Sequence, residues 1–251
     1  METKRNLKYF TSKGLTPLMI VALCVMLVGA ILFFPWSTRF IGVILLVVGV
    51  GMAIFASGGK ASGDDIEYQV AEKVKNMNER GMVRFELFQK SLKYLEPITV
   101  HGYEFGDDVY YKKGSDGRNR TNIYSEAILF FTGERIDIHR RRFSLTDDLL
   151  DEELGGTYKY IDLDHAEVQE HPFKREVGKH TVKFTDYHFV LIDAQGNAVL
   201  DMSVEYGADV DKACEDITRI IDIRKKAYAE KLARVEAERK ERIAAAAAEA
   251  K

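Results

Sequence analysis

Cysteine is scarce in this sequence, and neither sign of charge dominates it. The 251 residues include two cysteines, Cys24 and Cys214, which cannot form a disulfide framework and are typical of a protein in a reducing compartment. The formal net charge of -3 at pH 7 gives no global basic surface, so we expect no nucleic-acid partner. The sequence also lacks a nucleophile elbow, a phosphate-binding loop and a dinucleotide fingerprint. We therefore expect no cofactor and no catalytic residues of a common enzyme class.

Metal-ligand spacing is missing as well. In an extended strand, Asp162 and Asp164 would share one face while His165 points to the other, so these side chains would not converge on an ion. The acidic residues between 147 and 153 lack the alternating pattern and central glycine of a calcium loop. Three later histidines are predicted on separate turns and strands: His171, His180 and His188. We predict no metal site.

Charged side chains are absent from two apolar runs near the N-terminus, residues 16–34 and 40–56. At about 1.5 Å per helical residue these runs would be about 28 Å and about 25 Å long, close to the roughly 30 Å hydrocarbon core of a bilayer. We expect two membrane-spanning helices joined as a tight hairpin. A cleaved signal peptide is the alternative, but the first run is long for one and a second run follows it almost at once.

Basic residues favour one orientation of this hairpin. The first fifteen residues carry four basic side chains, whereas the loop between the runs carries only Arg39. By the positive-inside rule the N-terminus should be cytoplasmic, and two spans then return the C-terminal bulk to the cytoplasm. We predict a multi-pass protein of the cell membrane. Small residues at heptad spacing give each span a flat strip along which the backbones could meet: Ala22 and Gly29 in the first run, Gly42, Gly49 and Ala56 in the second.

A glycine- and serine-rich joint at residues 57–63 precedes a helical pattern. Apolar side chains recur from Ile66 to Leu95 at helical intervals, which predicts one amphipathic helix or two helices broken near Gly81. We expect the apolar stripe to pack on the following domain. The alternative is a coiled coil with a second copy, although the spacing is not a strict heptad.

From residue 97 the pattern changes to short runs rich in β-branched and aromatic residues. Turn signals at 113–117, 132–134 and 194–197 each separate two such runs, so antiparallel strands are expected. The acidic segment 144–156 is predicted as a loop or short helix. The candidate strands are 98–105, 109–113, 120–124, 127–132, 135–140, 158–163, 166–170, 181–185, 188–193 and 198–204.

The last predicted element is a long helix that begins near Asp209, a good N-cap residue. Its apolar stripe can cover the sheet as far as about Tyr228. Beyond that point the stripe thins, and acidic and basic residues four apart predict a solvated helical extension.

Strands followed by one amphipathic helix are the order found in pleckstrin-homology-like (PH-like) domains. Residues 127–138 (AILFFTGERIDI) resemble a hairpin of the PH-like domains of bacterial membrane proteins, and residues 160–168 (YIDLDHAEV) are similar to a later strand of that family. The resemblance covers about residues 97–224. It implies an antiparallel β-barrel or sandwich capped by a C-terminal helix, and a binding module without catalytic machinery.

The predicted chain is therefore an α+β membrane protein with five parts. They are a basic N-terminus (1–15), two transmembrane helices (16–56), a joint with an amphipathic helix (57–96), a PH-like domain with its capping helix (97–228) and a helical tail (229–251).

Basic side chains near one predicted turn form the candidate binding site. Lys112 and Lys113 precede the turn at 113–117, and Arg118 and Arg120 follow it, so a hairpin would bring four cations together. Phosphate groups need several converging cationic donors, and the family resemblance implies that such a loop binds a lipid head group. A second cluster contains Arg140 and Arg142, which could face anionic lipid. Solvated strand edges protected by charge are the alternative interpretation of both clusters.

Three functions are consistent with these features. The favoured one is a non-enzymatic, membrane-anchored module that binds a protein partner or an anionic lipid head group. The second is a scaffold that forms homo-oligomers through its amphipathic helices. The third is an enzyme whose site is assembled from scattered residues such as His101, His139 and Asp164.

Overall fold

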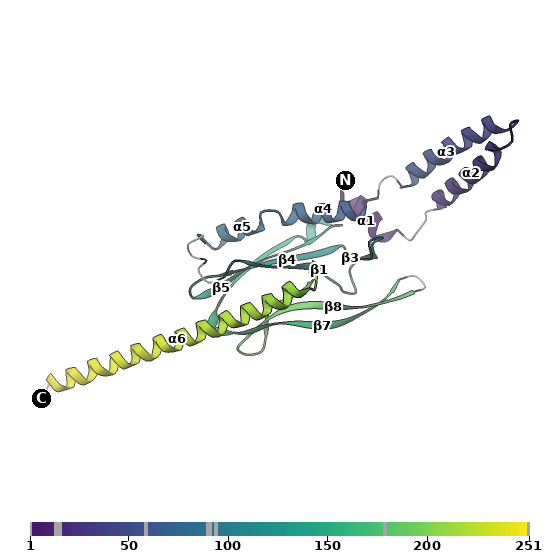
Figure 1. The fold of residues 1–251 in the computed structure, drawn as a ribbon. Helices are drawn as coiled ribbons and strands as arrows, with labels where there is room; N and C mark the ends of the chain where they lie inside the picture. Colours follow the sequence, from purple (N-terminus) through teal and green to yellow (C-terminus); the bar gives the residue numbers. More distant parts are fainter. Residues whose placement is uncertain are drawn as a thin grey trace. The chain divides into compact units, whose positions relative to one another are not determined.

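The computed structural model describes residues 2–12, 17–57, 60–88, 92, 95–177 and 180–249 (Figure 1). The fold is α+β with antiparallel sheets and a long C-terminal helix. The chain divides into two compact units, called here unit 1 and unit 2. Unit 1 comprises Met1–Glu72, Tyr110–Asn122 and Leu145–Asp148; unit 2 comprises Lys73–Val109, Ile123–Ser144 and Leu149–Lys251.

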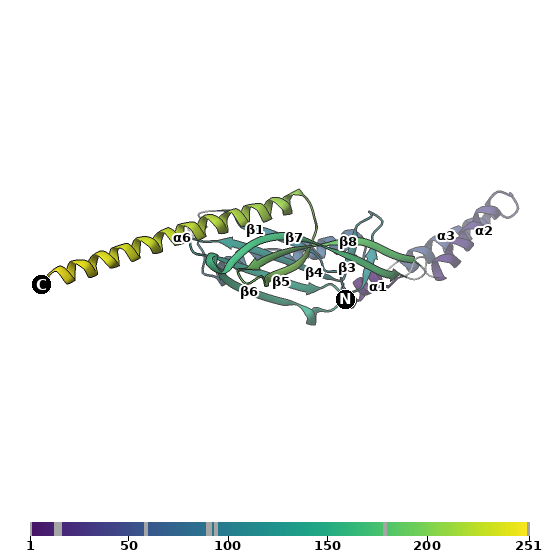
Figure 2. The same cartoon turned by 90° about the horizontal axis from the view of Figure 1, so that it is seen from below.

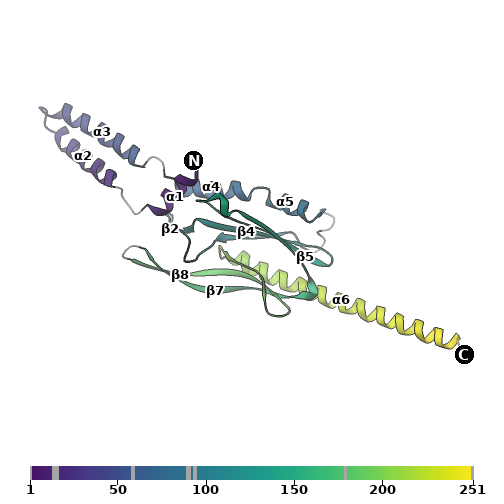
Figure 3. The ribbon, with the colours of Figure 1, turned by 180° about the vertical axis from the view of Figure 1, so that it is seen from behind.

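Two apolar helices, α2 (Pro17–Phe33) and α3 (Arg39–Ser57), pack against each other as a hairpin (Figure 3). In the described part of the chain, one helix is long and apolar enough to cross a membrane by length and composition, namely Arg39–Ala56 within α3. Only 11% of that segment is buried, so α3 is not the core helix of a soluble domain. Helix α2 has 17 residues. The structure thus supports one candidate span where the sequence predicts two.

The small residues of the two helices lie where the backbones meet. A Cβ atom added to Gly42 would lie 2.5 Å from the Phe33 nitrogen and 2.8 Å from the Gly29 oxygen. A Cβ atom on Gly29 would lie 2.9 Å from the Leu46 nitrogen. The close packing of α2 on α3 therefore requires glycine at both positions.

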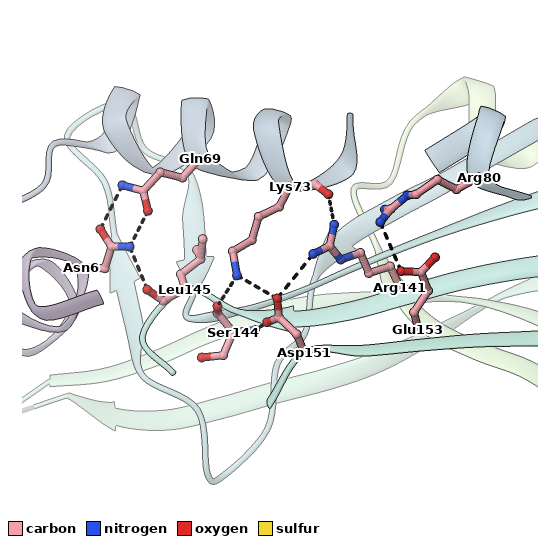
Figure 4. Close-up of polar contacts among 9 residues, drawn as sticks. All are labelled: Asn6, Gln69, Lys73, Arg80, Arg141, Ser144, Leu145, Asp151 and Glu153. Carbon is pink, nitrogen blue, oxygen red and sulfur yellow. Dashed lines mark hydrogen bonds and ion pairs between the residues drawn. The ribbon is translucent and has the colours of Figure 1, made fainter. Parts of the chain in front are cut away.

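Unit 1 contains a helix that the sequence did not predict. The basic N-terminus forms α1 (Glu2–Thr11), which buries Asn6, Tyr9 and Phe10. Asn6 Nδ2 donates hydrogen bonds to Gln69 Oε1 at 2.5 Å and to the Leu145 carbonyl oxygen at 2.7 Å (Figure 4). Gln69 belongs to α4 (Gly63–Val74). Unit 1 also contains a two-stranded hairpin of β2 (Tyr111–Lys113) and β3 (Asn119–Thr121).

Helix α4 begins with a capping box. The Ser62 hydroxyl accepts a hydrogen bond from the Asp65 nitrogen at 3.0 Å, and the Ser62 nitrogen donates to Asp65 Oδ2 at 2.8 Å. This exchange satisfies backbone donors that the first turn would otherwise leave unpaired. Ser62, near the end of the predicted joint at 57–63, therefore caps helix α4. Residues 58 and 59 of the joint lie outside the described residues.

Unit 2 contains two antiparallel sheets (Figure 2). The four-stranded sheet has the order β1 (Ile98–Tyr103), β4 (Ile123–Phe131), β5 (Arg135–Ser144) and β6 (Glu152–Lys159). The three-stranded sheet has the order β7 (Leu163–Val177), β8 (His180–Asp193) and β9 (Ala198–Val204). Two short 3-10 helices, η2 (Asp148–Leu150) and η3 (Tyr160–Asp162), interrupt the chain before and after β6. The described strands form separate sheets and no closed barrel.

Several predicted strand boundaries were wrong. The segment 144–156, expected as a loop or short helix, does contain the short helix η2, but it also contains most of β6, because β6 pairs along its length with β5. The expected strand 158–163 is instead the end of β6 followed by η3, and the two strands expected at 181–185 and 188–193 are one strand, β8. The expected strand 120–124 is divided at Asn122 between β3 and β4.

The core of unit 2 lies between the two sheets and the last helix, α6 (Ala208–Glu249). Alternate residues of β4, including Leu129 and Phe131, face this core with Phe189 of β8. Ile217 and Ile221 of α6 complete it, and Figure 1 shows α6 beside β7. The helix begins one residue before the predicted N-cap Asp209, and its exposed later turns agree with the predicted solvated extension.

A second apolar cluster lies on the opposite face of the four-stranded sheet. Helix α5 (Met77–Arg84) covers this face, and Met77 packs against Ile128 and Phe130 of β4. The predicted amphipathic helix does break, but at Asn76, which adopts a left-handed φ of 63° that asparagine tolerates, and not at Gly81. Gly81 instead allows close contact, since a Cβ atom there would lie 2.6 Å from the Phe130 ring.

The apolar helical pattern predicted from Ile66 to Leu95 also ends earlier than expected. Helix α5 stops at Arg84, and residues 89–91 and 93–94 of the prediction lie outside the described residues. The expectation that the stripe packs on its own domain is confirmed for α5. Two ion pairs attach the segment from Lys73 to Arg80 to the sheet (Figure 4). Lys73 pairs at 2.9 Å with Asp151, the residue before β6, and Arg80 pairs at 3.2 Å with Glu153 of β6.

Candidate functional site

The four predicted cations of the turn at 113–117 do lie on one hairpin. Lys112 pairs with Arg120 and Lys113 with Asn119 in the register of β2 and β3. Gly117 has a φ of +83°, which a residue with a side chain rarely adopts, so glycine is required at that point of the turn. The hairpin thus brings the cations into one short segment, but their side chains have different surroundings.

Arg120 is an internal cation of unit 1. Its side chain is 2% exposed. Its Nε donates to Glu67 Oε1 at 2.7 Å, while Nη1 and Nη2 donate to the two oxygens of Asp116 at 2.9 and 2.5 Å. Hydrogen bonds from Arg120 are the main reason that the pKa of Asp116 lies far below its ordinary value. This two-pronged geometry holds α4 to the hairpin and leaves Arg120 little capacity for a ligand.

Lys112 has a comparable structural role. Its Nζ donates to the Tyr9 carbonyl oxygen at 2.6 Å and to Ser12 Oγ at 3.3 Å, and it lies 4.2 Å from the centre of the Tyr9 ring. Burial, and secondarily the charge of Lys60, lowers the pKa of Lys112. The lysine therefore ties the hairpin to α1. Lys113 and Arg118 have exposed side chains and are the members of the predicted site that face solvent.

The second predicted cluster is partly neutralised. Arg140 Nη2 lies 3.1 Å from Glu104 Oε1, and Arg142 Nε lies 2.7 Å from Glu104 Oε2. Both arginines belong to β5, which has β4 on one side and β6 on the other. The alternative interpretation of a charge-protected strand edge is therefore wrong for this cluster, because β5 is an inner strand.

A polar cluster that the sequence did not reveal lies across β7, β8 and β9. The ring of His188 is hydrogen-bonded through Nδ1 to Asp201 Oδ1 at 2.7 Å and through Nε2 to Asp186 Oδ2 at 3.0 Å. Ser203 Oγ donates to the same Asp186 oxygen at 3.1 Å. The ring of His171 lies 4.4 Å from that of His188, so these two histidines, expected on separate elements, are neighbours. In the sequence, histidine and carboxylate residues alternate along neighbouring strands, and this pattern could have indicated the cluster.

The order Asp201, His188, Ser203 is similar to that of a nucleophilic triad, but its chemistry differs. Hydrogen bonding to Asp186, and then to Asp201, raises the pKa of His188 to about 9. The imidazole is thus protonated at neutral pH and cannot take a proton from Ser203, as a general base must. Ser203 is also buried and donates to a carboxylate. The cluster is better described as a partly buried ion network that stabilises the sheet.

The residues considered for a scattered enzyme site have separate partners. Tyr124 Oη lies 2.8 Å from His101 Nδ1, His139 lies 3.0 Å from Glu153, and Asp164 pairs with His165 at 2.9 Å. In the described ranges, no group of three or more histidine, cysteine, aspartate or glutamate side chains is arranged to hold a metal ion.

Comparison of the chain with protein-family models, curated protein sequences and solved structures finds no match.

Proposed function

We propose that this protein is a non-enzymatic binding module that is anchored in a membrane and presents a PH-like domain to a protein partner or an anionic lipid head group. The observation that carries the proposal is the arrangement of unit 2. Four antiparallel strands are followed by three antiparallel strands and then by a helix that packs on the core between the sheets. This order is the one that the family resemblance implies, with the β2–β3 hairpin inserted between β1 and β4.

Contacts within unit 1 support a two-span anchor. Helix α1 precedes the α2–α3 hairpin and α4 follows it, yet the Ala61 nitrogen donates to the Arg5 carbonyl oxygen at 3.3 Å, and Asn6 bonds to Gln69. These segments must therefore lie on the same side of a membrane. If α3 crosses, the chain must cross back, and 17 residues of α2 at about 1.5 Å each, about 25 Å, can do so. With the basic residues of α1, we propose a multi-pass topology with both termini cytoplasmic.

A labelling experiment tests this topology. Ser37→Cys in the loop between α2 and α3 should react with a membrane-impermeant maleimide added to intact cells, whereas Ser115→Cys at the exposed tip of the β2–β3 hairpin should react only after lysis. Cys214 is buried and Cys24 lies within α2, so the unsubstituted chain supplies the background signal. Labelling of Ser115→Cys in intact cells would contradict the proposed orientation.

Lys113 and Arg118 are the proposed contacts with anionic lipid. A cation close to an anionic membrane surface contributes about 1 kcal/mol, which is weak alone. Tethering through α2 and α3 raises the effective concentration of lipid at the domain, so a weak contact can be occupied.

Nanodiscs containing the full-length chain test the lipid contact. The full chain is needed because a fragment beginning at residue 61 would lack α1 and expose the surface that Tyr9 and Phe10 cover. Amide hydrogen exchange in residues 111–121 should be slower in discs that contain phosphatidylglycerol than in discs of phosphatidylcholine alone, and high salt should remove the difference.

The double variant Lys113→Ser/Arg118→Ser should lose this difference between the two disc types. The matched control Lys183→Ser/Lys240→Ser removes the same charge from exposed positions of β8 and α6 and should retain it. Equal exchange in both disc types for the unsubstituted chain would leave a protein partner as the supported ligand class.

A further inference from the structure

A second basic site lies entirely within unit 2, at a pocket of about 460 Å³. Three segments enclose it: the turn between β4 and β5, the end of β6 with η3, and the middle of α6. The charged residues of its lining are Glu134, Arg135, Lys159, Arg224 and Lys231. None of the residues in the predicted binding site belongs to this pocket.

The charge of the pocket differs from that of the chain. Four of its lining residues are basic and one is acidic, although the whole protein has a formal net charge of -3. A pocket of similar size, about 450 Å³, near the start of α6 has the opposite character, with Lys212 and four acidic residues among its lining. Basic residues are therefore in excess at the pocket near Arg224, although Arg135 is paired with Asp137 at 3.0 Å, and the pocket near the start of α6 does not share this excess.

Fixed contacts hold one wall of the pocket in place. Arg224 Nη2 donates to the Gly133 carbonyl oxygen, and the guanidinium lies 6.0 Å from the centre of the Tyr160 ring. Tyr160 is 2% exposed, and its hydroxyl donates to the Thr132 carbonyl oxygen at 2.9 Å. These contacts connect α6 to the β4–β5 turn through groups that are already ordered, so a ligand would not have to organise this wall.

Two lysines of the pocket are available to a ligand. Lys159 and Lys231 are exposed, and neither forms an ion pair within the part of the chain that the structure describes. Lys159 is the last residue of β6 and Lys231 belongs to α6, so the two lysines come from separate segments of the lining. An anion in the pocket could thus be approached by cations from separate segments, which is the arrangement that phosphate recognition requires.

We infer that this pocket binds a small molecule that carries a phosphate monoester. Its volume falls within the range of about 300 to 1,000 Å³ that is typical of small-molecule sites and exceeds the size of a phosphate group alone. Ile161, Ala227 and the half-exposed ring of Tyr228 offer apolar and aromatic surface for the organic part of the ligand. The inference is separate from the contact proposed for Lys113 and Arg118, because none of the lining residues belongs to the β2–β3 hairpin.

Calorimetry on the full chain in non-ionic detergent micelles tests the inference. Two probes distinguish the source of the phosphate: glycerol 3-phosphate as a soluble monoester, and phosphatidic acid mixed into the micelles as a lipid monoester. Phosphatidylglycerol, a diester, controls for negative charge alone. Saturable binding of either monoester, in preference to the diester, is the expected result, and the probe that binds identifies the source.

Matched variants assign that binding to the pocket. Lys159→Gln/Lys231→Gln should weaken the affinity about tenfold or more, because each lysine would make a charge-assisted hydrogen bond to the phosphate. Lys183→Gln/Lys240→Gln makes the same change in net charge at exposed positions outside the pocket and should alter the affinity less than about twofold. The absence of saturable binding, or equal weakening by pocket and control variants, would overturn the inference without affecting the proposed function.

Discussion

Replacing His188 with glutamine should lower the free energy of unfolding by about 3 kcal/mol more at pH 6 than at pH 10. Hydrogen bonds to Asp186, and then to Asp201, raise the pKa of His188 from 6.5 to about 9, although burial opposes this. A histidine whose pKa is higher in the folded state stabilises the fold fully below its unfolded pKa, and this contribution is lost as the pH rises through the folded pKa. The window is therefore about pH 6.5 to pH 9, and at about 1.4 kcal/mol per pKa unit the loss is about 3 kcal/mol.

Urea unfolding of the full chain in non-ionic detergent, followed by far-ultraviolet circular dichroism, measures this difference. The matched control is His165→Gln on β7. His165 also pairs with carboxylates that raise its pKa, but its side chain is 37% exposed compared with 21% for His188. Solvent screening should therefore make its pH-dependent contribution smaller. The same pH dependence in both variants would show that the hydrogen-bonded network around His188 is not responsible.

Local sequence signals predicted the parts of the fold that depend on neighbouring residues. The turn signal at 132–134 does connect β4 to β5, and the signal at 194–197 connects β8 to β9 through Gly196, whose φ is +86°. The start of α6 was predicted to within one residue, because an acidic residue suited to a helix N-terminus and a helical stripe occur together there, although Asp209 lies in the first turn and is not the N-cap. These features need only a few residues of context, and a single sequence contains that context.

Features that depend on distant residues were missed. Strand β6 contains two adjacent glycines and begins with acidic residues, which disfavour a strand locally. It forms because it pairs along its length with β5, where Glu152 and Glu153 lie opposite Arg142 and Arg141 in the register. The local composition of β6 could not indicate this pairing with β5.

The candidate binding site also depends on residues that are distant in sequence. Arg120 was expected to face a ligand because it lies beside a turn with three other cations. Its burial depends on Glu67, which is distant in sequence and belongs to α4. A basic residue in a hairpin has the same sequence pattern whether it binds phosphate or an internal carboxylate, so the distinction requires the structure. The pocket near Arg224 was missed for the same reason, since its walls come from β4–β5, β6 and α6.

Replacing Glu126 with glutamine should stabilise the protein at pH 8 and have little effect near pH 4. Glu126 is 8% exposed in β4, and burial raises its pKa from 4.5 to about 7, despite the opposing charge of Arg80. An acid with a higher pKa in the folded state makes the fold less stable as the pH rises from its unfolded to its folded pKa. Between about pH 4.5 and pH 7 the folded chain should thus lose about 3 kcal/mol through this one carboxylate.

The pH dependence distinguishes ionisation from packing as the cause. Glutamine has nearly the same shape as glutamate but cannot ionise, so the gain in unfolding free energy of Glu126→Gln should increase from pH 4 to pH 8, as measured by urea titration at each pH. An equal gain at both pH values would mean that packing, and not ionisation, is responsible. The single variant Arg80→Gln removes the cation that favours the ionised form. In that background the pKa of Glu126 should rise further, and the gain on adding Glu126→Gln should keep increasing to a higher pH and reach a larger value, because an unpaired carboxylate is more costly to bury than one beside a guanidinium.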